Sequence, residues 1–116
     1  GENCLVLFSG DAFSPSILSR NKKGWQMVKA LNSLNIDAAV TAIMNSIFHG
    51  HTIKLAKACN FPWLLGNIKN IKNGKVLGEG IPYITKTMPN GLKVGIFGVA
   101  GEDWISILSE EYEGLF

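Results

Sequence analysis

The chain has 116 residues, enough for one small hydrophobic core. Eleven Lys and Arg residues stand against nine Asp and Glu residues, so the formal net charge is only +2, and the basic residues form no dense stripe. This pattern gives nucleic-acid binding little support. No apolar run approaches the length of a membrane span, and no signal-peptide pattern is present.

The first predicted element is a buried strand over Asn3–Phe8, which ends at Ser9-Gly10-Asp11. This arrangement puts one carboxylate at the carboxyl end of the strand, the edge of an open α/β sheet where ligands and metal ions collect. A carboxylate is a hard oxygen ligand that can bridge two cations. Gly-Asp alone, however, favours a simpler interpretation, in which Asp11 caps the next helix.

Helices and strands then alternate along the chain. Apolar residues at spacings of three and four predict an amphipathic helix over Lys22–Leu34, with Asn35 as its stop. The other expected elements are, in chain order, a strand over Ile36–Thr41, a helix over His51–Cys59, a strand over Phe61–Asn67, a polar turn region over Ile68–Gly80, a hairpin formed by Tyr83–Met88 and Leu92–Val99, and the start of a helix over Glu102–Ser109. This order predicts a mixed α/β sheet with flanking helices.

Residues 9–16, SGDAFSPS, resemble the second metal motif of the calcineurin-like metallophosphoesterases, in the branch that includes the 5′-nucleotidases. The likeness continues in order through residues 31–40, 60–67, 90–98 and 102–104. It implies part of an αββα sandwich and a hydrolase of phosphate esters, whose two divalent metal ions are held by Asp, His and Asn on loops beyond the strand ends. In that arrangement Asp11 is a metal ligand that bridges the two ions.

One segment departs from the family pattern. After the strand that corresponds to Asp37–Val40, the family carries Gly-Asn-His-(Asp/Glu)-Phe-Asp, whose Asn is a metal ligand and whose His donates to the phosphate and the leaving group. Residues 42–47 instead read Ala-Ile-Met-Asn-Ser-Ile, with Ile43 in the Asn position and Met44 in the His position. An alkyl side chain cannot coordinate a metal, and a thioether is too soft for hard cations. Asn45 falls on the acidic position and is not taken as a displaced ligand.

A shift of reading frame accounts for this segment. Gly-Asn-His-Glu-Phe-Asp can be written GGC AAT CAT GAA TTC GAT, and reading it one base late gives GCA ATC ATG AAT TCG ATT. Those triplets encode Ala-Ile-Met-Asn-Ser-Ile, the residues found at 42–47. We therefore hypothesise that a base is lost near codon 41 and another gained near codon 47 or 48. True divergence is the alternative, and it would make the chain a degenerate, non-catalytic binding domain.

The resemblance also bears on domain organisation. The family's opening Asp-x-His motif would precede Gly1, and its later His and Gly-His-x-His motifs would follow Phe116. Residues 1–116 are therefore expected to be an internal fragment of a single metallophosphoesterase domain, marginally stable in isolation and inactive as written. The parent protein would act on a small-molecule phosphate ester or nucleotide. A generic α/β fragment remains a third interpretation, which the long ordered likeness disfavours.

Two histidines and two cysteines also have the side chains of metal ligands. His49-Gly50-His51 invites a metal interpretation, but near-adjacent histidines are poor tetrahedral partners, so a surface loop is favoured. Cys4 and Cys59 are expected to be small core residues, and a disulfide between them stays open.

Three tryptophans raise the question of base stacking. Trp25, Trp63 and Trp104 are expected instead to pack in the core, because large aromatic side chains on helices and strands usually supply buried area there.

Overall fold

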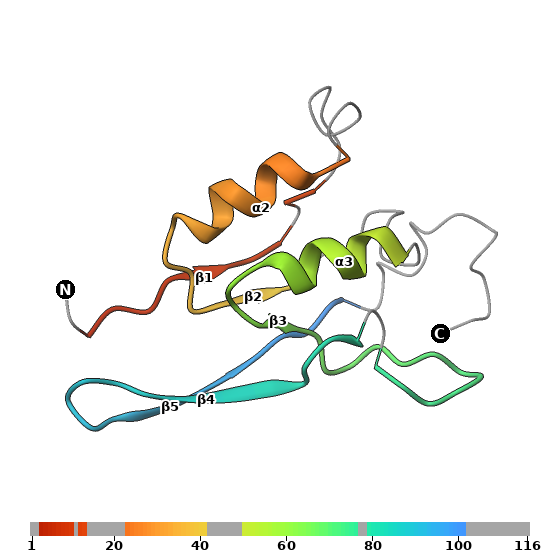
Figure 1. Cartoon of the computed structure of the whole chain (residues 1–116). Helices are drawn as coiled ribbons and strands as arrows, with labels where there is room; N and C mark the ends of the chain where they lie inside the picture. The colour runs from red at the N-terminus through yellow and green to blue at the C-terminus, as the bar shows by residue number, and fades with distance from the viewer. Residues whose placement is uncertain (1–2, 11, 14–22, 42–49, 77–78, 102–116) are drawn as a thin grey trace.

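A computed structural model describes residues 3–10, 12–13, 23–41, 50–76 and 79–101 of the chain (Figure 1). The elements, in order, are β1 (Leu7–Phe8), α2 (Trp25–Asn32), β2 (Ala38–Val40), α3 (Gly50–Ala58), β3 (Trp63–Leu64), β4 (Tyr83–Thr87) and β5 (Lys93–Phe97). The predicted mixed α/β fold class is confirmed. No helix within the described ranges is long and apolar enough to cross a membrane.

Strands β1, β2 and β3 form a parallel sheet in that order. The register pairs Phe8 with Ala39 and Ala39 with Trp63, so these three side chains share one row on one face. Together with Leu31 and Phe61 they build the main core beneath the two helices. Alternation along the strands turns the neighbouring residues to the opposite face.

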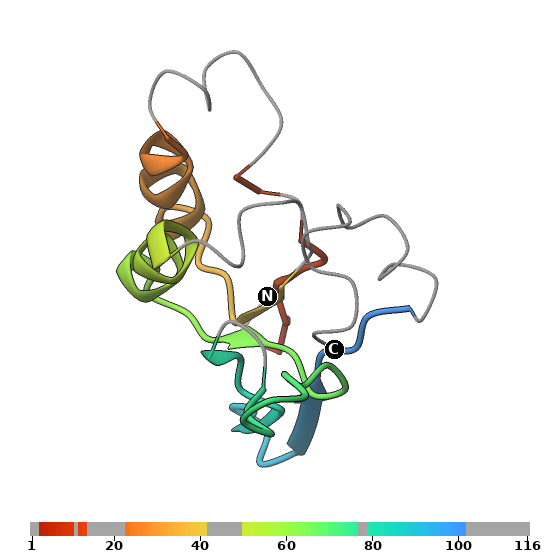
Figure 2. The ribbon, with the colours of Figure 1, turned by 90° about the vertical axis from the view of Figure 1, so that its right-hand side faces the viewer.

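The opposite face of the parallel sheet receives the antiparallel hairpin β4–β5. Ala38 and Leu64 pack there against Ile96 of β5. Ile81, just before β4, pairs with β3 through hydrogen bonds to Trp63 and Leu65. Figures 1 and 2 show the helices on one side of the parallel strands and the hairpin on the other. The described residues therefore form helix, sheet and hairpin layers.

The start of α2 depends on a glycine. Gly24 has φ +83°, a left-handed conformation that side chains disfavour, and a Cβ there would lie 2.8 Å from Leu55 Cδ1. The helix consequently begins at Trp25 rather than at Lys22. It ends at Asn32, and Asn35 adopts φ +50°, which fits its predicted role as a stop.

An asparagine clasp joins the carboxyl ends of the two helices. Asn32 Oδ1 accepts a hydrogen bond from the Asn60 backbone N–H at 2.8 Å, and Asn32 Nδ2 donates to the Ala58 carbonyl at 3.1 Å. Because both helices return the chain to the beginning of a parallel strand, this clasp lies at the amino edge of the sheet.

Asp37 connects the parallel sheet to the hairpin. Its Oδ2 accepts a hydrogen bond from the Val6 N–H at 2.8 Å, and its own N–H donates to the Val6 carbonyl at 2.8 Å. Its other carboxylate oxygen forms an ion pair with Lys86 of β4. The Asp37 side chain is only 13% exposed, so this pair is better shielded from solvent than an ordinary surface ion pair.

Two of the residues expected in the core lie outside it. Cys4 is exposed, and Trp25 is 45% exposed, so both predictions were wrong. Trp25 begins α2 on its outer side, where it contacts the edge of the His51 ring instead of the core. Trp63 is buried and Cys59 half-buried, as expected, while Trp104 lies outside the described residues. Cys4 and Cys59 are both free thiols.

Candidate active site

The candidate site is the carboxyl edge of the parallel sheet. Because β1, β2 and β3 run in the same direction, the segments that leave them meet at one edge. Ser9 and Gly10 follow β1, Thr41 follows β2, and Asn67 lies three residues beyond β3. The Thr41 N–H donates to the Leu64 carbonyl at 3.0 Å, which keeps the second of these segments beside the third.

The predicted site residues fall outside the described part of the chain. Asp11, Ile43 and Met44, like Asn45 and His49, have no described position.

The neighbours of Asp11 are described. Gly10 has φ +106°, a conformation that favours glycine, and so turns the backbone directly after β1. Ala12 and Phe13 then pack against the main core, with the Phe13 and Trp63 ring centroids 5.4 Å apart. The chain is therefore anchored to the core on both sides of position 11.

Among the described residues at this edge, Asn67 forms two hydrogen bonds through its side-chain amide. Its Nδ2 donates to the Ala100 carbonyl at 2.7 Å, and its Oδ1 accepts from the Ala100 N–H at 2.9 Å. The sequence placed Asn67 at the end of a strand without a role. Its partner is 33 residues away, and no local pattern indicates such a contact.

The described residues do not by themselves fit a metal pair. No group of three or more His, Cys, Asp or Glu side chains gathers within the described ranges. The polar side chains nearest the strand ends there are the hydroxyls of Ser9 and Thr41 and the amide of Asn67, whose nitrogen and oxygen already bond Ala100. Hard divalent cations prefer carboxylates. A metal centre at this edge would therefore depend on Asp11 and on further ligands from outside the described residues.

His51 has a structural role. Gly50 and His51 open α3, so this part of the expected surface loop is helical. The His51 Nε2 lies 2.6 Å from the Lys23 carbonyl, which ties the start of α3 to the turn that precedes α2. The half-buried His51 has no cluster of metal-ligating neighbours in the described part of the chain, so the metal interpretation gains no support.

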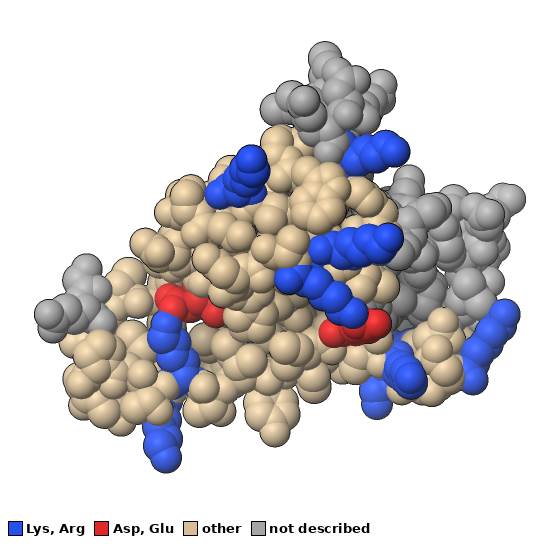
Figure 3. Space-filling view, in the orientation of Figure 1, with Lys and Arg blue, Asp and Glu red and all other residues tan. Residues whose placement is uncertain are grey.

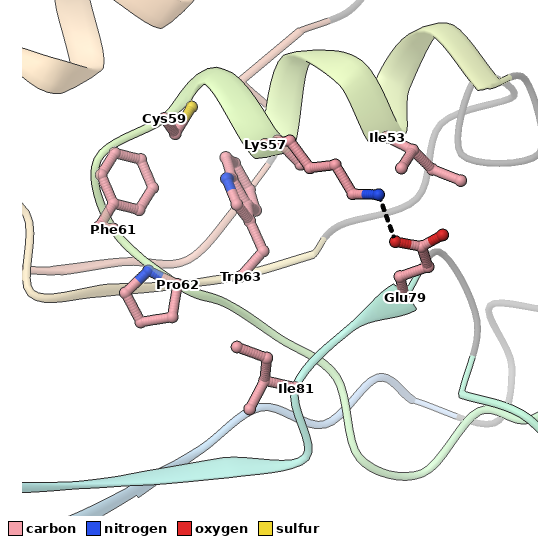
Figure 4. A pocket seen from close by; sticks show the side chains of 9 residues that line it. Ile53, Lys57, Cys59, Phe61, Pro62, Trp63, Glu79 and Ile81 are labelled. Atoms are coloured by element: carbon pink, nitrogen blue, oxygen red, sulfur yellow. Dashed lines mark ion pairs between the residues drawn. The ribbon is translucent and has the colours of Figure 1, made fainter.

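Away from the carboxyl edge, a hollow lies between α3 and the segment before β4 (Figure 4). Its volume is about 220 Å³, and its wall is mainly apolar, with Ile53, Phe61, Pro62, Trp63 and Ile81 among the lining residues. At one end, Lys57 and Glu79 point toward each other and form an ion pair of 2.6 Å. The pKa of the Glu79 carboxyl is lowered because Lys57 donates a hydrogen bond to it and is positively charged.

The Cys59 thiol lines the same hollow. Burial raises the pKa of Cys59, and the nearby Trp63 N–H lowers it by a smaller amount. That N–H is buried and has no acceptor within hydrogen-bond geometry among the described residues, so we regard its effect on the sulfur as a weak, longer contact. The thiol itself donates to the Leu55 carbonyl at 3.4 Å.

Cys4 is exposed and Cys59 is half-buried, and this difference in burial predicts the order in which the two cysteines react. With its pKa raised, Cys59 holds less of the reactive thiolate at a given pH, and it is less accessible than Cys4. We expect iodoacetamide at pH 7.5 to modify Cys4 at least about tenfold faster, and the Cys59 rate to rise as pH increases toward 9.5. Peptide mass spectrometry over time measures both rates. Equal rates in the folded chain would contradict the described burial of Cys59.

Charged side chains are dispersed over the face of the molecule that Figure 3 shows. Figure 3 shows Lys and Arg side chains spread over one face in separate places, with few acidic side chains among them.

Comparison with known proteins finds similarity to solved structures but not to family profiles or curated sequences. No protein-family profile matches the chain, and no curated protein sequence matches it either. Among solved structures, the chain is similar to the NAD nucleotidase of Haemophilus influenzae, with a TM-score of 0.71 and 21% sequence identity. The match covers 90% of this chain and 21% of the nucleotidase. The two share a fold. The chain therefore spans about a fifth of the length of the nucleotidase and has the architecture of that portion.

Proposed function

We propose that the chain is part of a metal-dependent phosphomonoesterase of the 5′-nucleotidase kind, acting on a small phosphate ester or nucleotide. This proposal depends mainly on one observation: the three parallel strands β1, β2 and β3 end at the same edge of the sheet, and the SGDAFSPS segment begins directly after β1. The fold shared with a nucleotidase supports it. Two divalent cations, when bound, would polarise phosphate oxygens and lower the pKa of a bound water.

In this proposal the residues of the chain have distinct tasks. Asp11 is a metal ligand, and Gly10 turns the backbone immediately before it. Asn67 has a structural task in this proposal, because its amide bonds both backbone groups of Ala100. The remaining ligands would come from the intact form of the 42–47 motif, whose Asn stands at the position of Ile43, and from other parts of the parent protein. With Ile43 and Met44 in place, these 116 residues are expected neither to hold a metal pair stably nor to turn over substrate.

The second candidate is a degenerate domain that binds a ligand or partner without catalysis. It is favoured by the literal residues Ile43 and Met44, which can neither coordinate a hard cation nor donate a proton to a leaving group.

The nucleotide sequence of the source gene across codons 38 to 52 separates the two candidates. An intact frame that encodes Gly-Asn-His-Glu-Phe-Asp supports the phosphomonoesterase, whereas Ala-Ile-Met-Asn-Ser-Ile without a slip supports the degenerate domain.

The role of Asp11 is tested in the complete gene product with an intact motif at 42–47. Asp11→Asn removes a negative oxygen ligand and is expected to lower the Mn²⁺-dependent release of phosphate from nucleoside monophosphates by at least about 10²-fold. Glu79→Gln is the matched control, because Glu79 is an exposed carboxyl paired with Lys57 at the hollow between α3 and the segment before β4. Equal activity of the Asp11→Asn variant and the unmodified protein would remove Asp11 from the metal site.

A further inference from the structure

Asn67 and Ala100 bond each other reciprocally at the carboxyl edge of the sheet. The side-chain amide donates to the carbonyl at 2.7 Å and accepts from the N–H at 2.9 Å, both within the normal range for good hydrogen bonds. A primary amide that satisfies both backbone groups of one residue reproduces the pattern of a neighbouring strand. The Asn67 side chain therefore acts here like a short piece of backbone.

This pair continues a contact between the two sheet layers. One residue earlier, the Gly66 N–H donates to the Gly98 carbonyl at 2.9 Å. Three hydrogen bonds consequently hold residues 98–100 against residues 66–67, beyond the ends of β5 and β3. The segment after the hairpin is thereby fixed at the edge where the segments after β1 and β2 also arrive.

We propose that Asn67 is a positioning residue, which holds residues 98–100 in place beside the proposed active site. This inference rests on the proposed function. Its amide bonds the backbone of Ala100, so Asn67 acts through the position of that segment. A loop displaced by about 1 Å can lower the rate of an enzyme by about 10²-fold. We therefore expect the loss of the Asn67–Ala100 pair to lower the catalytic rate more than the stability.

Asn32 provides a matched control at the opposite edge of the sheet. It also makes one accepted and one donated hydrogen bond to backbone, with the Asn60 N–H at 2.8 Å and the Ala58 carbonyl at 3.1 Å. Asn32→Ala and Asn67→Ala thus remove the same chemical groups and the same number of bonds. Only Asn67 lies at the carboxyl edge.

The first experiment measures amide hydrogen exchange in the complete gene product, because residues 1–116 alone are expected to be only marginally stable. We expect Asn67→Ala to abolish the protection of the Ala100 amide, and Asn32→Ala to affect Asn60 while leaving Ala100 protected. Both substitutions should lower the melting temperature by a similar amount, roughly 5 °C. Unchanged protection of Ala100 in the Asn67→Ala variant would overturn the inference.

The second experiment measures kinetics in the complete gene product with Gly-Asn-His-Glu-Phe-Asp at 42–47. Asn67→Ala is expected to lower kcat for nucleoside monophosphate hydrolysis by about 10–100-fold with little change in KM, whereas Asn32→Ala should stay within about twofold. Asn67→Asp retains the oxygen that accepts from the Ala100 N–H but places a second oxygen against the Ala100 carbonyl, so it should recover little of kcat. Equal losses in the two alanine variants would reduce Asn67 to a purely structural role.

The two proposals fail in distinguishable ways. If the product with an intact motif shows no phosphatase activity, the proposed function is overturned, and with it the effect of Asn67 on the rate. If that product is active and the Asn67→Ala variant equally so, the proposed function stands and the positioning role is overturned. Hydrogen exchange decides in either case whether Asn67 holds the segment.

Discussion

Replacing residues 42–47 by Gly-Asn-His-Glu-Phe-Asp is expected to raise the metal-dependent phosphatase rate of a gene product that carries Ala-Ile-Met-Asn-Ser-Ile by at least about 10³-fold. The replacement returns an amide oxygen to the position of Ile43 and an imidazole to that of Met44. The first can coordinate a hard cation, and the second can donate to the phosphate and to the leaving group. The measurement is phosphate release from nucleoside monophosphates with and without Mn²⁺.

Single substitutions separate the contribution of the amide at position 43 to the phosphatase rate from that of the imidazole at position 44. Ile43→Asn alone should strengthen Mn²⁺ binding without restoring the full rate, and Met44→His alone should leave Mn²⁺ binding weak. Asn45→Glu serves as the control, because it restores the acidic position and neither of the other two. A product that hydrolyses the substrate equally fast before and after the replacement would show that the segment has no part in the reaction.

Gly98→Ala is expected to have the largest effect on stability among single substitutions in the described part. A Cβ at position 98 would lie 2.5 Å from the Leu64 carbonyl oxygen and 2.8 Å from the Leu64 Cβ. The obstructing atoms include backbone of β3, so a side-chain rotation cannot relieve the clash. We expect the free energy of unfolding to fall by about 3 kcal/mol, since the hairpin has to move away from the parallel sheet. Urea denaturation followed by circular dichroism measures the change.

Gly95 offers a control within the same hairpin. It lies in β5, and a Cβ there would meet no atom within 4 Å. Gly95→Ala should therefore leave stability unchanged or raise it by up to about 1 kcal/mol, because alanine restricts the unfolded chain. If the two alanine variants unfold at the same urea concentration, the close approach of Gly98 to β3 is incorrect.

Local patterns in the sequence predicted the order and type of the main elements. The spacing of apolar residues indicated both helices, Pro89-Asn90-Gly91 indicated the hairpin, and Asn35 indicated the helix stop. The strands of the parallel sheet are shorter than predicted. A strand exists only where a neighbour pairs with it, and the apolar run Asn3–Phe8 pairs with β2 over Leu7 and Phe8 alone.

The contacts between residues far apart in the sequence, at the candidate site and elsewhere in the fold, were beyond sequence reasoning. Asn67 and Ala100 are 33 residues apart, and the Val6–Asp37 pair is 31 residues apart. Such pairs depend on how layers meet in space, which no periodicity encodes. Trp25 illustrates the same limit, because its apolar character predicted burial while its place on the outer side of α2 leaves it 45% exposed. Asp11, the predicted metal ligand, remains a prediction.

The row formed by Phe8, Ala39 and Trp63 has an evolutionary consequence. The smallest of the three side chains stands between two aromatic ones, and all three share the same limited space beneath the helices. A larger residue at position 39 would overfill this space unless position 8 or 63 became smaller at the same time. Substitutions at these positions are therefore coupled, and related sequences should conserve the summed volume of the row rather than the identity of any one member.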